Sequence, residues 1–286
     1  MSNTSGGKSM TLARYIHDDN VKARINQLLA ERTPQFVTSL ISAVNASSSL
    51  AKCEPRSVLT AALTAASMKL EINPNLGFAY LIPYDTKNGS LCQFQMGYKG
   101  FIQLAQRSGL YKTINAEDVR EGEIISRDRL SGDIKFNWAD DKTRQKLKVV
   151  GYVAYFELLN GFSKMLYMTT NELLVHAKKY SKAFAKTGAG VWVDEFDGMA
   201  KKTVLKLLIS KYGALDTELQ KAVVSDQAVD GAYVDNPNSL EAKAEDVEEM
   251  KAIVHKKLGI EPGNGGETVD SLTPITVEDF DKHENS

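Results

Sequence analysis

Residues 96–109 read Met-Gly-Tyr-Lys-Gly-Phe-Ile-Gln-Leu-Ala-Gln-Arg-Ser-Gly and combine cations with an aromatic ring. We assign Lys99 and Arg107 to one wall of a groove that is expected to bind phosphate, and Tyr98 is a candidate for stacking on a base. Cations beside aromatic rings are typical of surfaces that hold single-stranded nucleic acid. Two other readings stay open: Tyr98 also fits packing beneath a neighbouring hairpin, and the glycines flanking the Tyr-Lys pair also fit a tight turn.

A second basic segment covers residues 178–211, where lysines recur at helical spacing. Lysines four residues apart lie on one face of a helix, so two neighbouring helices are each expected to present a basic face. Trp192 lies between them and is a second candidate for base stacking. A solvated lysine face is the alternative for each single lysine. The residues of this segment that we assign to a phosphate-tracking groove are Lys178, Lys182, Lys201, Lys202 and Lys206.

A third basic cluster covers residues 112–148, and from it we assign Lys112 and Arg120 to the same groove. Acidic residues are interleaved with these cations. Four carboxylates in this arrangement suit Mg²⁺, as in a metal-dependent nuclease, and they also suit solvated charges at a strand edge. These four are Glu117, Asp118, Glu121 and Glu123.

Several enzyme classes fail on their motifs. Residues 5–9, Ser-Gly-Gly-Lys-Ser, imitate the end of a P-loop but lack its first glycine and a preceding strand. The four histidines are scattered, without the spacing of a zinc site, and no nucleophile motif is present. Cys53 and Cys92 are expected to be buried thiols in a reducing cytoplasm. We therefore expect neither ATP nor a required metal cofactor.

The elements that must position these side chains begin as helices. Apolar residues at helical spacing dominate the first 75 residues. Thr33-Pro34 predicts an N-cap followed by proline in the first turn, and Pro55 opens another helix. The run Asn73-Pro74-Asn75 ends it, because the residue before a proline disfavours the α conformation.

From Phe78 the pattern changes to strands, and Asn88-Gly89 predicts a β-hairpin. A helix is expected over residues 98–108, with Gly109 ending it and Phe101 in its buried stripe. The later expected elements are strands near 113–126, 133–138 and 147–168, a helix opened by a capping box at Thr169–Glu172, and a helix from about Asp194 to Tyr212, closed by Gly213. This order predicts an α+β fold with N-terminal helices, central hairpins around one helix, and C-terminal basic helices.

Formal charge divides the chain into a basic body and an acidic tail. Residues 226–286 hold 15 Asp and Glu against 5 Lys and Arg, whereas residues 1–225 hold 30 Lys and Arg against 21 Asp and Glu. This asymmetry is typical of a polyanion binder with a separate interaction segment.

The same patterns divide the chain into three segments. We expect an N-terminal arm with a short helix, placed between subunits, over residues 1–30, and a polyanion-binding core over residues 31–224. Residues 225–286 are expected to form a flexible acidic segment, with a linker at 225–240 and a short helix near 239–258. No apolar run of 18 residues and no secretory leader appear, which predicts a cytoplasmic protein without a membrane span.

Four blocks in consistent order resemble the RecT family of phage and prophage single-strand annealing proteins. They are Leu70–Tyr84, Gly97–Gly109, Val119–Gly122, and Trp192 with Met199–Thr203, and the resemblance extends over about residues 50–225. Leu205 and Lys206 align with a pair of arginines in that family, so one cation is missing from this chain.

The resemblance implies a recombinase that binds single-stranded DNA and anneals complementary strands without nucleotide hydrolysis. It implies a ring or helical filament of identical subunits that holds the annealed duplex, with Mg²⁺ at most a modulator. A partner exonuclease or the host single-strand binding protein is expected to bind the C-terminal segment, in the cytoplasm of a bacterial host. Two alternatives stay open: a Mg²⁺-dependent nuclease that uses the four acids named above, and a protein-interaction module with a basic surface.

Overall fold

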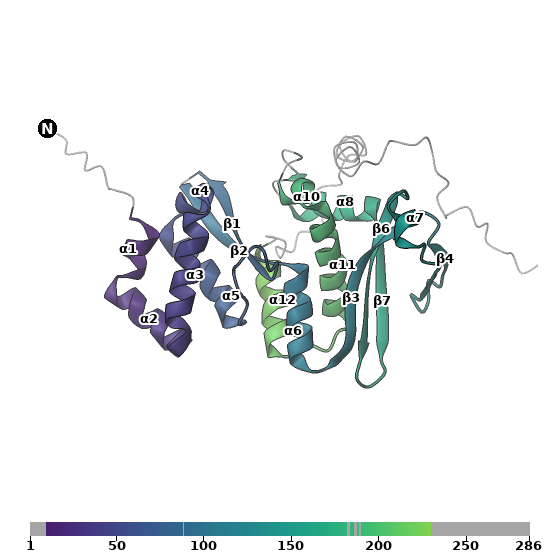
Figure 1. Cartoon of the computed structure of the whole chain (residues 1–286), viewed down its shortest axis with the longest axis horizontal. Helices are drawn as coiled ribbons and strands as arrows, with labels where there is room; N and C mark the ends of the chain where they lie inside the picture. Colours follow the sequence, from purple (N-terminus) through teal and green to yellow (C-terminus); the bar gives the residue numbers. More distant parts are fainter. Residues whose placement is uncertain (1–9, 88, 182–183, 186–187, 189, 230–286) are drawn as a thin grey trace, which may run out of the picture.

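The computed structural model describes residues 10–229 except 88, 182–183, 186–187 and 189. Helices and antiparallel strands together form the predicted α+β fold. The molecule is elongated (Figure 1). Its N-terminal helices and first hairpin lie at one end, and a three-stranded sheet with its covering helices forms the rest.

Short helices build the N-terminal end of the molecule. Asp18 caps one of them, because its Oδ1 accepts hydrogen bonds from the backbone N–H groups of Asn20 (3.1 Å) and Val21 (3.3 Å). The helix starts predicted near Pro34 and at Pro55 are confirmed. Thr33 is not an N-cap, because it is already the first residue of its helix and a 3₁₀ turn leads directly into it. The elements are α1 (Leu12–Ile16), α2 (Asp19–Leu29), η1 (Ala30–Arg32), α3 (Thr33–Asn45), α4 (Ser48–Ala51) and α5 (Pro55–Ser67).

The predicted hairpin and the helix after it connect this end to the sheet. Strands β1 (Ala79–Thr86) and β2 (Gly89–Met96) pair in antiparallel register. Helix α6 (Tyr98–Ser108) follows and ends at Gly109, whose φ of 68° is the left-handed conformation that glycine adopts readily. The motif at residues 96–109 is therefore the joint between a hairpin and a helix, as predicted.

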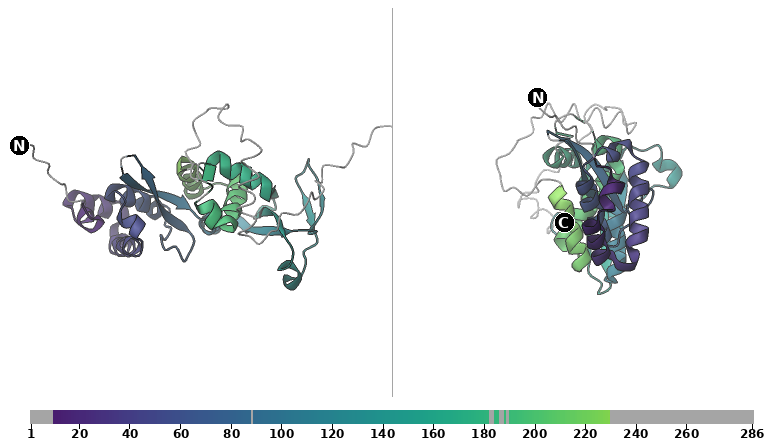
Figure 2. Two further views of the ribbon diagram at one scale, coloured as in Figure 1. Left: turned by 90° about the horizontal axis from the view of Figure 1, so that it is seen from above. Right: turned by 90° about the vertical axis from the view of Figure 1, so that its left-hand side faces the viewer.

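The main sheet has the strand order β3-β6-β7. Helix α11 contacts all three strands, and α8 contacts β6 and β7. Thr169 and Glu172 form the predicted capping box at the start of α8. A second hairpin, β4-β5, and the short α7 project at the end of the molecule away from the N-terminal helices (Figures 1 and 2). The bounds are β3 (Tyr111–Arg120), β4 (Ile124–Arg127), β5 (Ile134–Phe136), α7 (Asp141–Arg144), β6 (Val149–Leu158), β7 (Ser163–Thr169), α8 (Thr170–Tyr180), α10 (Val191–Asp194) and α11 (Phe196–Tyr212).

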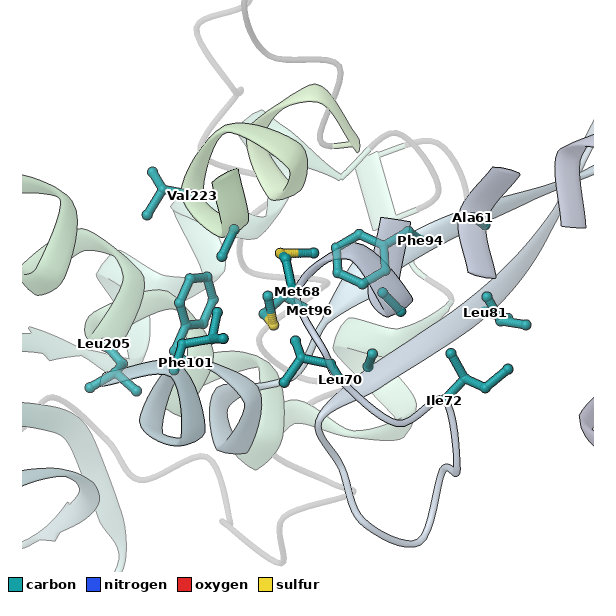
Figure 3. Close-up of a cluster of buried hydrophobic side chains, with 14 of the residues drawn as sticks. Ala61, Met68, Leu70, Ile72, Leu81, Phe94, Met96, Phe101, Leu205 and Val223 are labelled. Carbon is teal, nitrogen blue, oxygen red and sulfur yellow. The ribbon is translucent and has the colours of Figure 1, made fainter. Parts of the chain in front are cut away.

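One apolar core runs through the joint between the two ends of the molecule. Figure 3 shows Phe94 and Met96 of β2 beside Phe101 of α6, with Leu205 of α11 and Val223 of the last helix next to them. Phe101 is fully buried, as its place in the amphipathic stripe predicts. This shared core fixes α6 against α11 and against the hairpin.

The last described helix, α12 (Thr217–Val229), was not predicted. It contacts β2 and α6, and it buries Leu219, Ala222 and Asp226 completely. The prediction of a linker from residue 225 is therefore wrong for residues 225–229. The expected helix near 239–258 lies outside the described residues. Within the part that is described, no helix is long and apolar enough to cross a membrane.

Candidate nucleic-acid interface

The Gly-Tyr-Lys-Gly corner is held by close packing between backbone segments of the same chain. A Cβ on Gly97 would overlap the carbonyl oxygen of Gly77, and one on Gly100 would overlap that of Phe78. The N–H of Gly97 donates to Phe78 O at 3.0 Å. Both glycines therefore allow α6 to begin directly against the backbone of residues 77–78.

This corner presents Lys99 to solvent and keeps Tyr98 half-buried against the core. Lys99 lies in the first turn of α6, which has no side-chain cap and no acidic residue in that turn. The N-terminal end of a helix carries partial positive charge and unsatisfied N–H groups, so it adds to the charge of the lysine. The corner therefore has the character of an anion-binding surface, with Tyr98 as a neighbouring aromatic ring.

Arg107 is anchored inside the chain rather than presented to a ligand. Its guanidinium donates to the carbonyl oxygens of Met68 (2.9 Å) and Lys69 (3.2 Å) and also pairs with Glu218 of α12. These bonds satisfy backbone groups just after α5 and connect α5, α6 and α12. The structure thus corrects the expectation that Arg107 lies beside Lys99 as one wall of a groove.

Lys202 and Lys206 do share a helix face, but that face is directed at a buried carboxylate. Their Nζ atoms lie 2.7 Å from Oδ1 and Oδ2 of Asp226, respectively. Asp226 is fully buried, and its Oδ1 also accepts the N–H of Met96 at 3.2 Å. Although burial opposes ionisation, the two lysines hold the pKa of Asp226 below its usual value. Both lysines therefore neutralise an internal charge.

Lys201 also has acidic partners. Its Nζ lies 3.2 Å from Asp197 and 3.6 Å from Glu117, and its side chain is only 14% exposed. Although burial opposes protonation, Asp197 and then Glu117 raise the pKa of Lys201. Lys201 is a cation at neutral pH that ties α11 to β3.

The remaining groove candidates are spread over separate elements. Lys112, on β3, is exposed and pairs with Glu157 at 2.7 Å. Lys178 is half-buried on α8, which ends at Tyr180. Lys182 lies outside the described residues. Ser181, directly after α8, has an extended backbone, so the first of the two predicted basic helices does not continue past Tyr180.

Trp192 is a core residue. It is 5% exposed, and its ring packs edge-on against Phe196 with a centroid distance of 5.8 Å. The ring of His176 also lies near it, with a centroid distance of 6.4 Å. Base stacking needs a free ring face, so the structure corrects the assignment of Trp192 to stacking.

Two of the four carboxylates of the nuclease alternative are neutralised by arginines. Asp118 pairs with Arg120 (2.5 Å) and Arg144 (3.1 Å), and Glu123, which is 1% exposed, pairs with Arg144 at 3.1 Å. Glu117 faces Lys201, as described above. Arg120 also donates to the carbonyl oxygen of Leu147 at 2.9 Å, so it is a structural residue of this network.

In the described ranges, no group of three or more His, Cys, Asp or Glu side chains is placed to hold a metal ion. Glu121, the fourth acid of the nuclease alternative, is exposed. A carboxylate that already has an arginine partner gains less from a cation, so this geometry argues against a magnesium centre at Glu117–Glu123.

An exposed aromatic residue in a basic setting was missed by the sequence interpretation. Trp138 is 45% exposed and stacks on Phe136, with ring centroids 4.6 Å apart. The exposed lysines of the surrounding segment are Lys135, Lys142, Lys146 and Lys148. The pattern of two aromatic residues, two positions apart within a basic segment, was the available signal. Lys99 and this segment thus carry exposed positive charge, as does Lys112, which is paired with Glu157.

The fold and these surfaces define an α+β protein whose basic residues are partly structural and partly exposed. Residues 34–244 match the RecT family. The chain belongs to the RecT family, so the resemblance found in its motifs is confirmed. Membership makes it a single-strand annealing protein of DNA recombination.

Two relatives illustrate how far the similarity extends. The chain is 41% identical over 216 residues to the uncharacterized protein YqaK of Bacillus subtilis (strain 168), covering 76% of this chain and 72% of YqaK. It is 29% identical over 236 residues to Protein RecT of Escherichia coli (strain K12), covering 77% of this chain and 81% of that protein.

Proposed function

We propose that this protein binds single-stranded DNA, assembles on it as a ring or helical filament, and anneals complementary strands without ATP. The observation that carries the proposal is the match to the RecT family over residues 34–244. The positive charge of residues 1–225 and the exposed Lys99 at the start of α6 support it.

The physical basis is neutralisation of phosphate with the bases left accessible. Each lysine that contacts a phosphate releases condensed counterions, which increases the magnitude of the logarithmic salt slope of binding by roughly 0.7 per contact for single strands. Pairing with a second strand then supplies both specificity and driving force, since stacking contributes about 1.4 kcal/mol per base-pair step. No nucleotide hydrolysis is needed, and Mg²⁺ is at most a modulator of DNA binding.

Lys99→Ala tests the contact at the α6 corner. We expect weaker binding of an oligonucleotide and a salt slope reduced by about 0.7. Fluorescence anisotropy over a series of salt concentrations measures both quantities, and Lys99→Arg is the matched control that keeps the charge. Unchanged affinity and slope in Lys99→Ala would remove Lys99 from the interface.

Labelled single strands incubated with Mg²⁺ separate annealing from cleavage. Faster duplex formation at constant strand length supports the proposal, whereas shortened strands support the nuclease. Failure of the unaltered protein to bind any oligonucleotide at low salt favours a protein-interaction module.

We further propose that the acidic segment binds a partner exonuclease or the host single-strand binding protein, in the cytoplasm of a bacterial host.

A further inference from the structure

A large apolar side chain stands at the tip of the β4-β5 hairpin. Leu130 is 98% exposed, and Ile125 on the same hairpin is 65% exposed. Trp138, just after β5, is 45% exposed. Single exposed apolar residues are common, but several on one projecting lobe mark a contact surface. We call the loop 128–133 with Leu130 at its tip the knob.

Hydrogen bonds hold the knob in one conformation. Oδ1 of Asp128 accepts from the backbone N–H groups of Leu130 (2.7 Å) and Ser131 (3.2 Å), and the N–H of Asp128 donates to Asp133 O at 2.9 Å. Lys164 of β7 donates to the carbonyl oxygen of Ser131. A loop already ordered in this way loses little entropy when it docks, so it is suited to insertion into a partner.

A groove lies among the helices at the other end of the chain. Residues of α1, α2, η1 and α3 enclose about 480 Å³. Ile16, Ile25 and Val37 give it an apolar lining, and Lys22 and Glu31 add one charge of each sign. Pockets of about 300–1,000 Å³ hold small ligands, so this volume admits a leucine side chain and its neighbours. We call it the N-terminal groove.

The helices whose residues line the N-terminal groove and the β4-β5 hairpin that carries the knob lie at opposite ends of the long axis (Figures 1 and 2). One molecule is therefore unable to fill its own groove with its own knob, whereas a second copy can. Both surfaces also carry charges of both signs: Arg127 and Asp133 are exposed at the two ends of the knob, and Glu31 and Lys22 line the groove.

We propose that the knob of one subunit inserts Leu130 into the N-terminal groove of the next copy of this chain. This inference rests on the proposed function, which requires the subunits to assemble. The two surfaces differ, so the contact is heterologous. Repetition of a heterologous contact gives a ring when the rotation closes and a helical filament when it does not.

Two variants test the two surfaces separately. Leu130→Asp places a charge on the knob, and Asn26→Trp fills the groove from an exposed position on α2. Each should weaken self-association by about 30-fold or more, the size of a hot-spot loss. Leu159→Asp is the matched control, because Leu159 is 69% exposed in the β6-β7 turn. Sedimentation velocity with and without single-stranded DNA measures the assembly.

Mixing the two variants gives the decisive result. Leu130→Asp retains its groove and Asn26→Trp retains its knob, so an equimolar mixture should form dimers and nothing larger. Assembly of Leu130→Asp like the unaltered protein, or a mixture that stays monomeric, overturns the proposal. If those results occur while the unaltered protein still anneals strands, only this interface fails and the proposed function stands.

Discussion

Replacing Asp226 by asparagine keeps the shape of the side chain and removes the charge that Lys202 and Lys206 share. Both lysine side chains lie largely out of solvent, at 5% and 13% exposure, so neither ammonium group regains full hydration. Removing one partner of a buried ion pair costs about 3–5 kcal/mol. Total stabilities are about 5–15 kcal/mol, so this loss is a large fraction of the whole.

We expect Asp226→Asn to lower the free energy of unfolding by about 3–5 kcal/mol. For a protein of this size, Tm should fall by about 6–20 °C. Urea denaturation and thermal melting followed by circular dichroism measure these quantities. Glu218→Gln, in the same helix, is the control: Glu218 pairs with Arg107 and Lys69 at 26% exposure, so its loss should cost about 1 kcal/mol.

The pH dependence of the same variant gives a second, independent check. The pKa of Asp226 is lowered in the folded protein. The ionised carboxylate therefore contributes its full stabilisation of the fold above the pKa of the unfolded chain, near 3.9, and loses it as pH falls through the lower pKa of the folded protein. The difference in free energy of unfolding between the unaltered protein and Asp226→Asn should therefore stay constant from about pH 5 to 8 and narrow below about pH 4. A gap under 1 kcal/mol, or one unaffected by acid, would show that the two lysines are not held by this carboxylate.

Two further predictions concern other elements. Gly100→Ala should destabilise the protein by about 2 kcal/mol or more in urea melts, because its Cβ would overlap Phe78 O. Gly198→Ala, with no atom within 4 Å of the added Cβ, should be neutral or stabilise by up to about 1 kcal/mol, and equal losses in both would refute the packing argument. Burial has the largest effect on the pKa of His176 and, together with the charges of Lys206 and Lys179, lowers it to about 4. The unfolded chain therefore binds a proton that the folded protein resists, so the free energy of unfolding should fall by up to about 3 kcal/mol as pH falls from 6.5 to 4. His176→Gln should flatten that slope in acid titrations, and an unchanged slope would assign it to other groups.

Local elements were predictable because their causes are local. Gly109 ends α6 and the Thr169–Glu172 box starts α8 through contacts within a few residues. Periodicity likewise placed Phe101 in the core. Helix α12 was missed because it reads as a charged, weakly apolar segment, and Asp226 was counted as part of an acidic tail.

The candidate site was harder to predict, because a cation in a sequence carries no record of its partner. Lys202 and Lys206 have the helical spacing of a phosphate-binding face, yet their partner Asp226 lies on another helix. Arg107 reads as an exposed cation of a short helix, but it pairs with backbone carbonyls 38 and 39 residues away. Trp192 has lysines as neighbours in the sequence, which suggested an exposed ring, but tertiary packing buries it in the core.

The sequence by itself determined the family, the α+β class, and the hairpin-helix joint that carries Lys99, because motifs and periodicity depend on neighbours along the chain. Only the tertiary structure decided which cations are available to DNA. The availability of a cation depends on its burial and on carboxylates brought close from distant segments. Arg107, Lys202 and Lys206 pair with such carboxylates, whereas Lys99 is exposed. The same three-dimensional arrangement placed the Leu130 knob and the N-terminal groove at opposite ends of one molecule.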